Sequence, residues 1–287
     1  MATLAVIGGS GVYDLDELRH GDIVEVDTPF GPPSGPVRRG WIAGTEVLFL
    51  ARHGVGHVYS PSTVPYRANI YALKDLGATH LLSLSAVGSL REELPPRTLV
   101  VPDQIIDRTL GRDRSFFDKG LVAHVGIADP FCNRLQAAIG TAAAGAGRAL
   151  RTGGAYVCIE GPQFSTRAES NLYRSWDAAI IGMTAMPEAR LAREAEMCYA
   201  MLAMVTDYDV WHDSEADVSV EVVNSNLQAN SEAASAILTK LAAGGLSRRT
   251  CSCASALDHA IVTSVESIPA EARARIGILV GNRLGIL

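Results

Sequence analysis

Two acidic residues stand close together after the apolar run of residues 199–205. Asp207 and Asp209 are separated by a single tyrosine. Side chains two positions apart on a strand point to the same side, so both carboxyl groups can face one ligand if the chain is still extended there. Two close carboxyl groups in a partly dry pocket raise one of their pKa values, which keeps a proton available for donation. The pair therefore predicts a general acid.

Hydrogen-bond donors follow other apolar runs of the chain. Ser10 stands in "IGGSG", whose backbone amides can approach an anion closely. This loop lacks the glycine spacing of a dinucleotide fingerprint and the lysine of a P-loop. Arg52 and His53 offer donors that suit phosphate oxygens, and Ser85 and Thr184 follow two further runs. These donors predict an anion site without a metal, because no group of carboxylates and histidines has metal-ligand spacing.

These side chains must be positioned by the elements that precede them. Five β-rich runs end in polar clusters, namely "TLAVI", "VLFLA", "HLLSL", "AAIIG" and "YAMLAMV". Between them, residues 64–77 and 187–197 have the apolar spacing or the composition of helices. Alternating strands and helices predict one α/β domain with a mixed, largely parallel central sheet flanked by helices. Ligands of such sheets bind beyond the carboxyl ends of the strands, so we expect the polar clusters to share one site.

The composition favours a folded domain and excludes some partners. A hydrophobic content of 48% in 287 residues suffices for a sizeable core, and a formal net charge of −6 offers no basic stripe for nucleic acid. Small anionic ligands bind through local sites and are compatible with this charge. No signal-peptide pattern and no stretch long enough for a membrane helix occur, which favours a cytoplasmic protein without membrane contact.

The C-terminal part differs from the repeated pattern of strands and helices. We assign residues 1–245 to the main body and residues 246–287 to a helical extension of the same domain. Residues 255–264 and 269–284 have helix-like patterns. The second segment could pack on the body or on a neighbouring subunit, and the sequence does not decide between them.

Five cysteines are spread along the chain, and Cys251 and Cys253 form its one close pair. The C-x-C spacing is too tight for a usual pair of structural zinc ligands. Small buried thiols are the simplest interpretation. A disulfide between Cys132 and Cys198, or between Cys251 and Cys253, is the alternative.

An ordered series of motifs resembles a known family. The series comprises "IGGSGVYDL", "TPFGPPS", "ARHGVGH", "PYRANIYALKDLGATH", "SAVGSLREE", "IDRT", "CIEGPQFSTRAES", "MTAMPEARLAREAEMCYA" and "TDYDVW", and covers most of the first 230 residues. In these motifs the chain resembles the methylthioadenosine phosphorylase branch of the purine nucleoside phosphorylase family, a branch of homotrimers. The resemblance implies phosphorolysis of a nucleoside, with inorganic phosphate as co-substrate and without a cofactor or a metal.

The resemblance also implies a role for each matching residue. Phosphate contacts are implied for Ser10, Arg52, His53, Ser85, Ala86 and Thr184, a ribose contact for Met183, and base contacts for Phe164, Ser165, Asp207 and Asp209. A pocket for the 5'-substituent is implied for His57, Val220 and Val223, with His124 reaching in from the next subunit. Carboxylates that accept from a 6-amino group repel the oxygen of a 6-oxopurine, so adenine nucleosides are the expected substrates.

Departures from the family pattern leave alternatives open. Ser10 and Ser85 stand where threonine is frequent, which keeps the hydroxyl groups, and Gly182 stands where a polar residue is common. Asn224 makes the 5' pocket more polar, so a 5'-halo-5'-deoxyadenosine or adenosine itself is the alternative substrate. A phosphate-independent nucleosidase would share the fold but would need a water-activating acid in place of the Arg52 and His53 donors.

Overall fold

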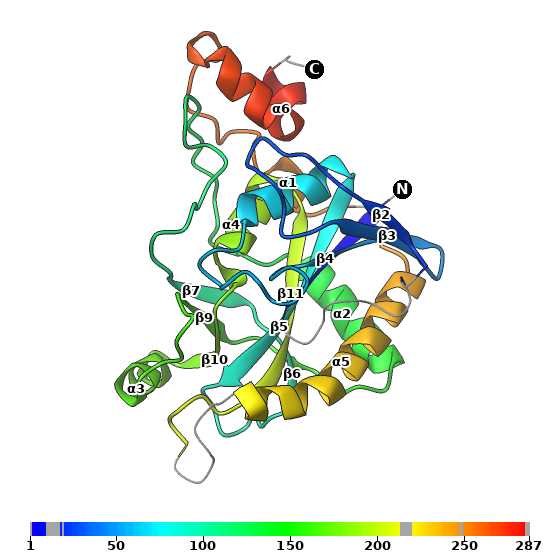
Figure 1. Ribbon diagram of the computed structural model, residues 1–287, viewed down its shortest axis with the longest axis vertical. Coiled ribbons are helices and arrows are strands. Elements are labelled where there is room, and N and C mark those ends of the chain that lie inside the picture. Colours follow the sequence, from blue (N-terminus) through cyan, green and yellow to red (C-terminus); the bar gives the residue numbers. More distant parts are fainter. Residues whose placement is uncertain (1, 10–17, 19, 213–219, 247–248, 285–287) are drawn as a thin grey trace.

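The structure is a computed structural model that describes residues 2–9, 18, 20–212, 220–246 and 249–284 (Figure 1). Ser10 lies outside the described residues. Val220 and Val223 lie in the first turns of α5, Val220–Ala243, where the backbone is described and the side chains are not. The predicted roles of these three side chains therefore stay predictions.

A mixed sheet of eleven strands forms the centre of the described part of the chain. The main path runs in the order β2-β3-β4-β1-β5-β10-β9-β7, while β11 pairs with β5 and β6, and β8 pairs with β6. The strands are β1 Thr3–Gly8, β2 Asp22–Val24, β3 Val37–Ile42, β4 Thr45–Ala51, β5 Ala78–Ser89, β6 Leu99–Val101, β7 Gln104–Arg108, β8 Arg151–Thr152, β9 Ala155–Ile159, β10 Ala178–Gly182 and β11 Cys198–Asp207. The pairs β1–β4, β1–β5 and β5–β11 are parallel, so the predicted mixed, largely parallel sheet is confirmed.

The apolar run of β11 shows why the sheet needs a layer of helices on each face. Alternate residues of β11 belong to two different cores: Tyr199 and Met201 pack in one, whereas Ala200 and Leu202 pack in the other. Successive side chains of a strand point to opposite faces, so a strand buried on both faces reads as a continuous apolar run. All ten residues of β11 are buried.

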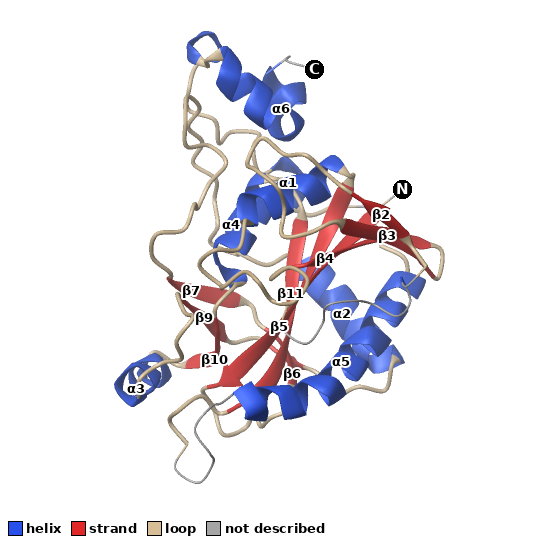
Figure 2. Cartoon of the chain, in the orientation of Figure 1, coloured by secondary structure: helices blue, strands red, loops and turns tan. Residues whose placement is uncertain are grey.

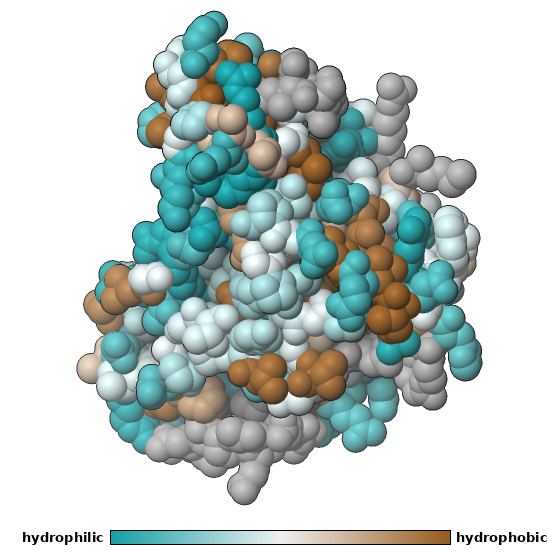
Figure 3. All heavy atoms as spheres, turned by 45° about the horizontal axis from the view of Figure 1, so that its top comes forward, coloured by the Kyte–Doolittle hydropathy of each residue, from teal (hydrophilic) through white to brown (hydrophobic). Residues whose placement is uncertain are grey.

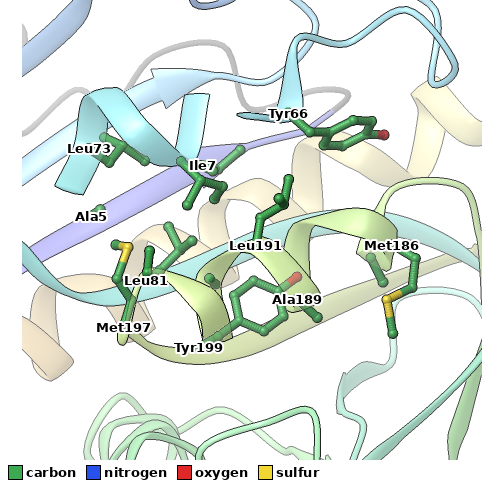
Figure 4. Packing of buried hydrophobic residues seen from close by; sticks show 14 of the residues in the cluster. Ala5, Ile7, Tyr66, Leu73, Leu81, Met186, Ala189, Leu191, Met197 and Tyr199 are labelled. Carbon is green, nitrogen blue, oxygen red and sulfur yellow. The ribbon is translucent and has the colours of Figure 1, made fainter. Parts of the chain in front are cut away.

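Helices cover both faces of this sheet (Figure 2). On one face, α1 (Tyr66–Asp75) and α4 (Ala185–Glu194) contribute Leu73 and Leu191 to the core drawn in Figure 4. On the other face, α2 (Asn133–Gly145) packs with α5 and contributes Ile139. The predicted helices around residues 64–77 and 187–197 are thereby confirmed.

Two expectations about the elements were wrong in detail. The run "HLLSL" does not end its strand, because β5 continues to Ser89 and its last residues pair antiparallel with β10. Residues 255–264 are not a regular helix. They form the end of a 3-10 helix, η2 Ser252–Ser255, followed by turns, and Ile261 makes a β-bridge with Ala123. That pairing takes the backbone out of helical geometry.

The last helix packs on a long connection between β7 and α2. This helix, α6 (Ala270–Leu284), lies at the top of Figure 1, beyond α1. Its Arg275 donates to the Lys119 carbonyl oxygen at 2.8 Å, and Ile276 and Leu279 join the same core as Leu73. A short 3-10 helix, η3 Val265–Ser267, precedes it. The segment therefore packs on the body of its own subunit.

The surface is mixed in character. On the face drawn in Figure 3, apolar residues form separate patches among hydrophilic ones. No helix in the described ranges is long and apolar enough to cross a membrane.

Candidate active site

One cavity of about 670 Å³ collects most of the predicted site residues. The predicted residues that line it are Arg52, His53, His57, Ser85, Ala86, Phe164, Met183, Thr184, Asp207 and Asp209. For the text below, Arg52, His53, Ser85 and Thr184 form the anion side of the cavity, and Asp207 with Asp209 forms the acid side. The structure thus brings together both groups that the sequence placed in one site.

The second half of β5 links the two sides. Gly88 pairs with Asp207 of β11 and with Ile181 of β10. Ser85 stands three residues earlier on the same strand, and a strand rises about 3.3 Å per residue, so the two levels are about 10 Å apart. A Cβ atom at position 88 would lie 2.9 Å from Asp207 Oδ1. Glycine at this position therefore leaves room for the acid side.

Arg52 is fully buried and its charge is already paired inside the protein. Its Nε donates to Glu188 at 2.8 Å, and its Nη2 donates to Ser83 Oγ at 2.8 Å. Burial lowers the pKa of Arg52, but the Glu188 carboxylate more than offsets this effect and raises the pKa overall. Nη1 donates one proton to the Leu84 carbonyl oxygen at 3.1 Å, and its second proton has no acceptor among the described residues. One N–H of a fixed guanidinium is thus left for an anion.

Sequence reasoning missed Glu188, which is also buried and accepts from the Tyr199 hydroxyl at 2.9 Å. A carboxylate directly after Pro187 in a helix-forming stretch carried no signal that distinguished it from a solvated helix residue. Only the burial of Arg52, which the structure shows, indicates that a carboxylate must lie beside it, because a buried cation needs a partner.

His53 has a defined tautomer when it is neutral. Its Nδ1 lies 2.8 Å from the Tyr59 carbonyl oxygen, which only accepts, so Nδ1 carries the proton. Burial, together with the charge of Arg52, lowers the pKa of His53 to about 4. Nε2 of the neutral ring therefore offers a lone pair. The sequence predicted a donor to phosphate here, whereas the geometry gives an acceptor for a phosphate or ribose hydroxyl proton.

Thr184 offers a hydroxyl that no other described residue uses. It is the N-cap residue of α4, yet its side chain makes no capping hydrogen bond. Its buried Oγ1 has no hydrogen-bond partner within the described ranges. A buried hydroxyl without a partner is costly, so a ligand that contacts it gains this unmet hydrogen bond.

The acid side is built by a turn rather than by strand alternation. β11 ends at Asp207, and Asp209 follows with a φ of +52°, so the condition of an extended chain is not met. Both residues still line the cavity, and the Asp209 backbone N–H donates to Asp207 Oδ1 at 2.8 Å. The other Asp207 oxygen accepts from the Thr206 hydroxyl at 2.7 Å. Asp207 is thereby fixed by its neighbours.

Asp209 differs from Asp207 in what its oxygens contact. Its buried Oδ2 has no partner in the described part of the chain. Burial raises the pKa of Asp209 to about 6, against the effect of the Ser170 hydroxyl and with the help of the Asp207 charge. Burial also raises the pKa of Asp207. The expected upward shift in an acid pair is present, and its larger part is desolvation.

Two further residues that the sequence did not single out hold the loop after β10. Arg112 donates from Nη1 to the carbonyl oxygens of Met183 and Met186, both at 2.7 Å. A Cβ atom at Gly182 would collide with the Tyr156 hydroxyl, which accepts from the Thr184 backbone N–H at 3.5 Å. The glycine that departs from the family pattern is therefore matched by a buried tyrosine.

The remaining predicted residues lie at or beyond the rim. Phe164 lines the cavity and is 44% exposed. Ser165 is not among the lining residues, although its buried Oγ also has no partner among the described residues. His124 is exposed on the connection before α2, and its backbone N–H donates to the Ala260 carbonyl oxygen at 2.8 Å. His124 does not line the cavity of its own subunit.

Comparisons with known proteins show which family the chain is similar to. A family model described as the phosphorylase superfamily matches residues 3–243. S-methyl-5'-thioadenosine phosphorylases of Geobacter sulfurreducens and Cereibacter sphaeroides are each 49% identical to the chain, over 97% and 98% of its length and 98% of theirs. A solved methylthioadenosine phosphorylase from an Antarctic soil metagenomic library is 47% identical, with a TM-score of 0.90 over 97% of this chain and 98% of that one.

A more distant solved structure is a variant of the adenosine/methylthioadenosine phosphorylase of Schistosoma mansoni in complex with tubercidin. It is 36% identical, with a TM-score of 0.81, and the alignment covers 86% of this chain and 93% of that one. The family match, the nearly full-length relatives and the shared fold lead to one conclusion. The chain belongs to the phosphorylase superfamily.

Proposed function

We propose that the protein catalyses the phosphorolysis of 5'-deoxy-5'-methylthioadenosine to adenine and 5-methylthioribose 1-phosphate. The names of the nearly full-length relatives support this activity. The observation that carries it is a pair of buried polar atoms on the two sides of one cavity, Thr184 Oγ1 and Asp209 Oδ2, which have no hydrogen-bond partner among the described residues. A hydroxyl donor suits a phosphate oxygen, and a carboxyl group suits the edge of a purine.

The anion side would hold the attacking phosphate. The second Nη1 proton of Arg52 and the Thr184 hydroxyl supply donors, and Nε2 of neutral His53 accepts a proton of the phosphate or of a ribose hydroxyl. Ser10, Ser85 and Ala86 complete the predicted phosphate contacts. A phosphate oxygen forms a bond to C1' as the bond from C1' to N9 breaks, and the anion stabilises the oxocarbenium character of the transition state.

The acid side would receive the departing base. The electron pair of the broken bond enters the purine, and a proton at N7 neutralises it. Asp209 has a buried oxygen without a partner in the described part of the chain, and Asp207 is fixed beside it. We assign the N7 and 6-amino edge of adenine to this pair, with Phe164 and Ser165 along the base. The cavity level at Ser85 then belongs to phosphate and the level at Gly88 to the base.

The proposal keeps the other sequence-based predictions. Met183 would lie against the ribose, and His57, Val220 and Val223 would face the 5'-substituent. His124 is exposed and outside the cavity of its own subunit, which supports its predicted contribution to a neighbouring site in a homotrimer. We propose that the reaction needs no metal and no organic cofactor and takes place in the cytoplasm.

The decisive test is the dependence of adenine release on phosphate. Methylthioadenosine is incubated with the enzyme in phosphate-buffered and phosphate-free solutions, and adenine and the sugar product are separated and quantified. We expect release only with phosphate and an equimolar sugar phosphate. Equal release without phosphate, with free methylthioribose as product, would instead establish a nucleosidase.

A substrate panel tests the 5' preference and the preference for a 6-amino group. Methylthioadenosine, adenosine, a 5'-halo-5'-deoxyadenosine and inosine are compared at saturating phosphate. The alternative substrate class is kept because a solved relative is named for both adenosine and methylthioadenosine. We expect the highest kcat/KM for methylthioadenosine and the lowest for inosine, whose 6-oxygen meets a carboxylate.

A further inference from the structure

Four of the five cysteines converge at one point on the opposite face of the sheet from α1 and α4. The sulfur atoms of Cys132, Cys198, Cys251 and Cys253 all lie within 4.8 Å of one another. Cys132 precedes α2, Cys198 begins β11, and the other two belong to the segment around η2. Among the described residues, this is the one group of histidine, cysteine and acidic side chains close enough to share a metal ion.

The spacing of the sulfur atoms fits a metal centre better than disulfides. Cys251 Sγ lies 3.7 Å from Cys132 Sγ and 3.4 Å from Cys198 Sγ, and all five cysteines are free thiols. A disulfide joins its sulfurs at about 2.05 Å. Four sulfurs at roughly 2.3 Å from a tetrahedral zinc ion lie about 3.8 Å from each other. The observed spacing matches the edges of that tetrahedron.

The surroundings of the cluster favour thiolate ligands. Cys132 is the N-cap residue of α2, where the helix dipole stabilises negative charge. The Arg193 guanidinium donates to Cys253 Sγ at 3.6 Å. A cation beside the sulfurs offsets the negative charge of a tetrathiolate centre.

We propose that these four cysteines bind one zinc ion as a structural site. Each thiol proton passes to solvent as its sulfur–zinc bond forms, the ion stays divalent, and no oxidant or reductant takes part. Four protein ligands complete the tetrahedron and leave no position for water or substrate, which distinguishes a structural from a catalytic zinc. The site is separate from the cavity and does not depend on the proposed phosphorolysis.

The prediction that the C-x-C pair is too tight for zinc considered that pair alone. The fold supplies the two other ligands from positions that are distant in sequence, and the 3-10 turn presents both sulfurs of the pair. No sequence pattern joins residues 132, 198 and 251, because their proximity exists only in the tertiary structure.

The site would fasten the start of the C-terminal segment to the sheet. Beyond Cys253, Ala260 accepts the hydrogen bond from the His124 backbone and Ile261 makes the bridge to Ala123. Binding energy of a structural zinc is folding energy, so the ion would stabilise this whole region. Loss of the metal would loosen the support of the connection that carries His124.

The first experiment measures metal content. The full-length protein is purified under reducing conditions without chelators, and zinc is quantified by mass spectrometry. We expect about one zinc per chain, and at most a tenth of that in Cys253→Ser and Cys132→Ser. Cys158→Ala is the matched control, because Cys158 is buried outside the cluster and this variant should keep its zinc.

A second measurement decides the question if the cluster variants fail to fold. Apoprotein of the unaltered chain is titrated anaerobically with cobalt(II), and a tetrahedral tetrathiolate gives sulfur-to-metal charge-transfer bands and visible d–d bands. Wild-type protein that holds no zinc, and takes up neither zinc nor cobalt when reduced, would overturn the proposal. So would disulfide-linked peptides of these cysteines in the metal-free native protein under non-reducing conditions.

Discussion

The anion side and the acid side of the cavity differ in whether their buried polar groups already have partners. On the anion side the positive charge of Arg52 is compensated before any ligand arrives, because Glu188 lies 2.8 Å from its Nε. On the acid side a buried carboxyl oxygen of Asp209 lacks a partner among the described residues, and burial raises its pKa. On the anion side, the charge of Arg52 is paired and one of its N–H groups is left for a ligand. On the acid side, one carboxyl oxygen of Asp209 still lacks a hydrogen-bond partner among the described residues.

This difference indicates which side of the cavity contributes to folding stability and which side serves mainly the reaction. A buried ion pair that loses one partner leaves an uncompensated charge, so changes on the anion side should disturb folding and binding together. A carboxyl group with an unsatisfied oxygen is a cost that the fold tolerates for its function. Changes at Asp209 should therefore reduce the reaction and leave the fold intact.

The largest expected effect belongs to Asp209→Asn. Loss of the titrating group should lower kcat/KM for methylthioadenosine by about a hundredfold or more, the usual scale of general-acid catalysis. Asp207→Asn should cost several tens-fold at pH 7, because Asp207 already accepts from Thr206 and from the Asp209 backbone. Initial rates of adenine release measure both effects. Asp177→Asn, at an exposed surface carboxylate, is the control.

Kinetics of Asp209→Asn within threefold of wild type would remove Asp209 from the mechanism. A loss of folding stability in the same variant would contradict the contrast between the two sides, since it would show that the acid side also stabilises the fold. Thermal melting of the two variants beside Asp177→Asn distinguishes these outcomes.

The second effect is on stability at the anion side. Arg52→Met leaves Glu188 buried without its cation and should lower the free energy of unfolding by about 3–5 kcal/mol. Adding Glu188→Gln removes the orphaned charge and should recover most of this loss, while the KM for phosphate stays raised. Denaturant titration and phosphate kinetics of the single and double variants separate the two roles. Equal stability of the two variants would contradict the pairing argument.

The sequence predicted the strands, their polar ends and six of the lining residues because these depend on local pattern, whereas the other four lining residues followed only from the family resemblance. It placed Asp207 and Asp209 together for the wrong reason, since strand alternation cannot foresee the positive φ of Asp209. The sequence did not identify Glu188 and Arg112, because their roles depend on contacts to distant parts of the chain. The donor role of His53 stays a prediction, because the tautomer of a histidine depends on its partner, and the Tyr59 carbonyl leaves Nε2 of the neutral ring as an acceptor.

A third, smaller effect tests the free hydroxyl of Thr184. Thr184→Val keeps the shape and removes the hydroxyl, so the KM for phosphate should rise about tenfold, the value of one good hydrogen bond to a charged group. The stability should stay the same or increase, because a buried hydroxyl without a partner is replaced by a methyl group. Thr184→Ser keeps the hydroxyl and serves as the control. A destabilised Thr184→Val with unchanged phosphate kinetics would show that the hydroxyl is structural.

The last test is a pH dependence that belongs to Asp209 alone. With a pKa of about 6, the carboxyl group loses its proton as the pH rises through that value. The ratio of wild-type to Asp209→Asn kcat/KM should therefore fall above pH 6, towards tenfold per pH unit, while the ionisation of phosphate cancels in the ratio. A ratio that is flat from pH 5 to 8 would show that Asp209 donates no proton.

The raised pKa of Asp209 also makes the folding stability depend on pH. The folded protein binds the proton of Asp209 more tightly than the unfolded chain, in which the pKa of this group is near the ordinary 3.8. The stability that protonated Asp209 contributes is therefore fully present below pH 3.8 and is lost as the pH rises through about 6. Asp209→Asn removes this loss, so its melting temperature should decline less than that of wild type between pH 4 and 6. If the two melting temperatures decline in parallel, another group must cause the pH dependence. Asp207 is the neighbour whose pKa burial also raises.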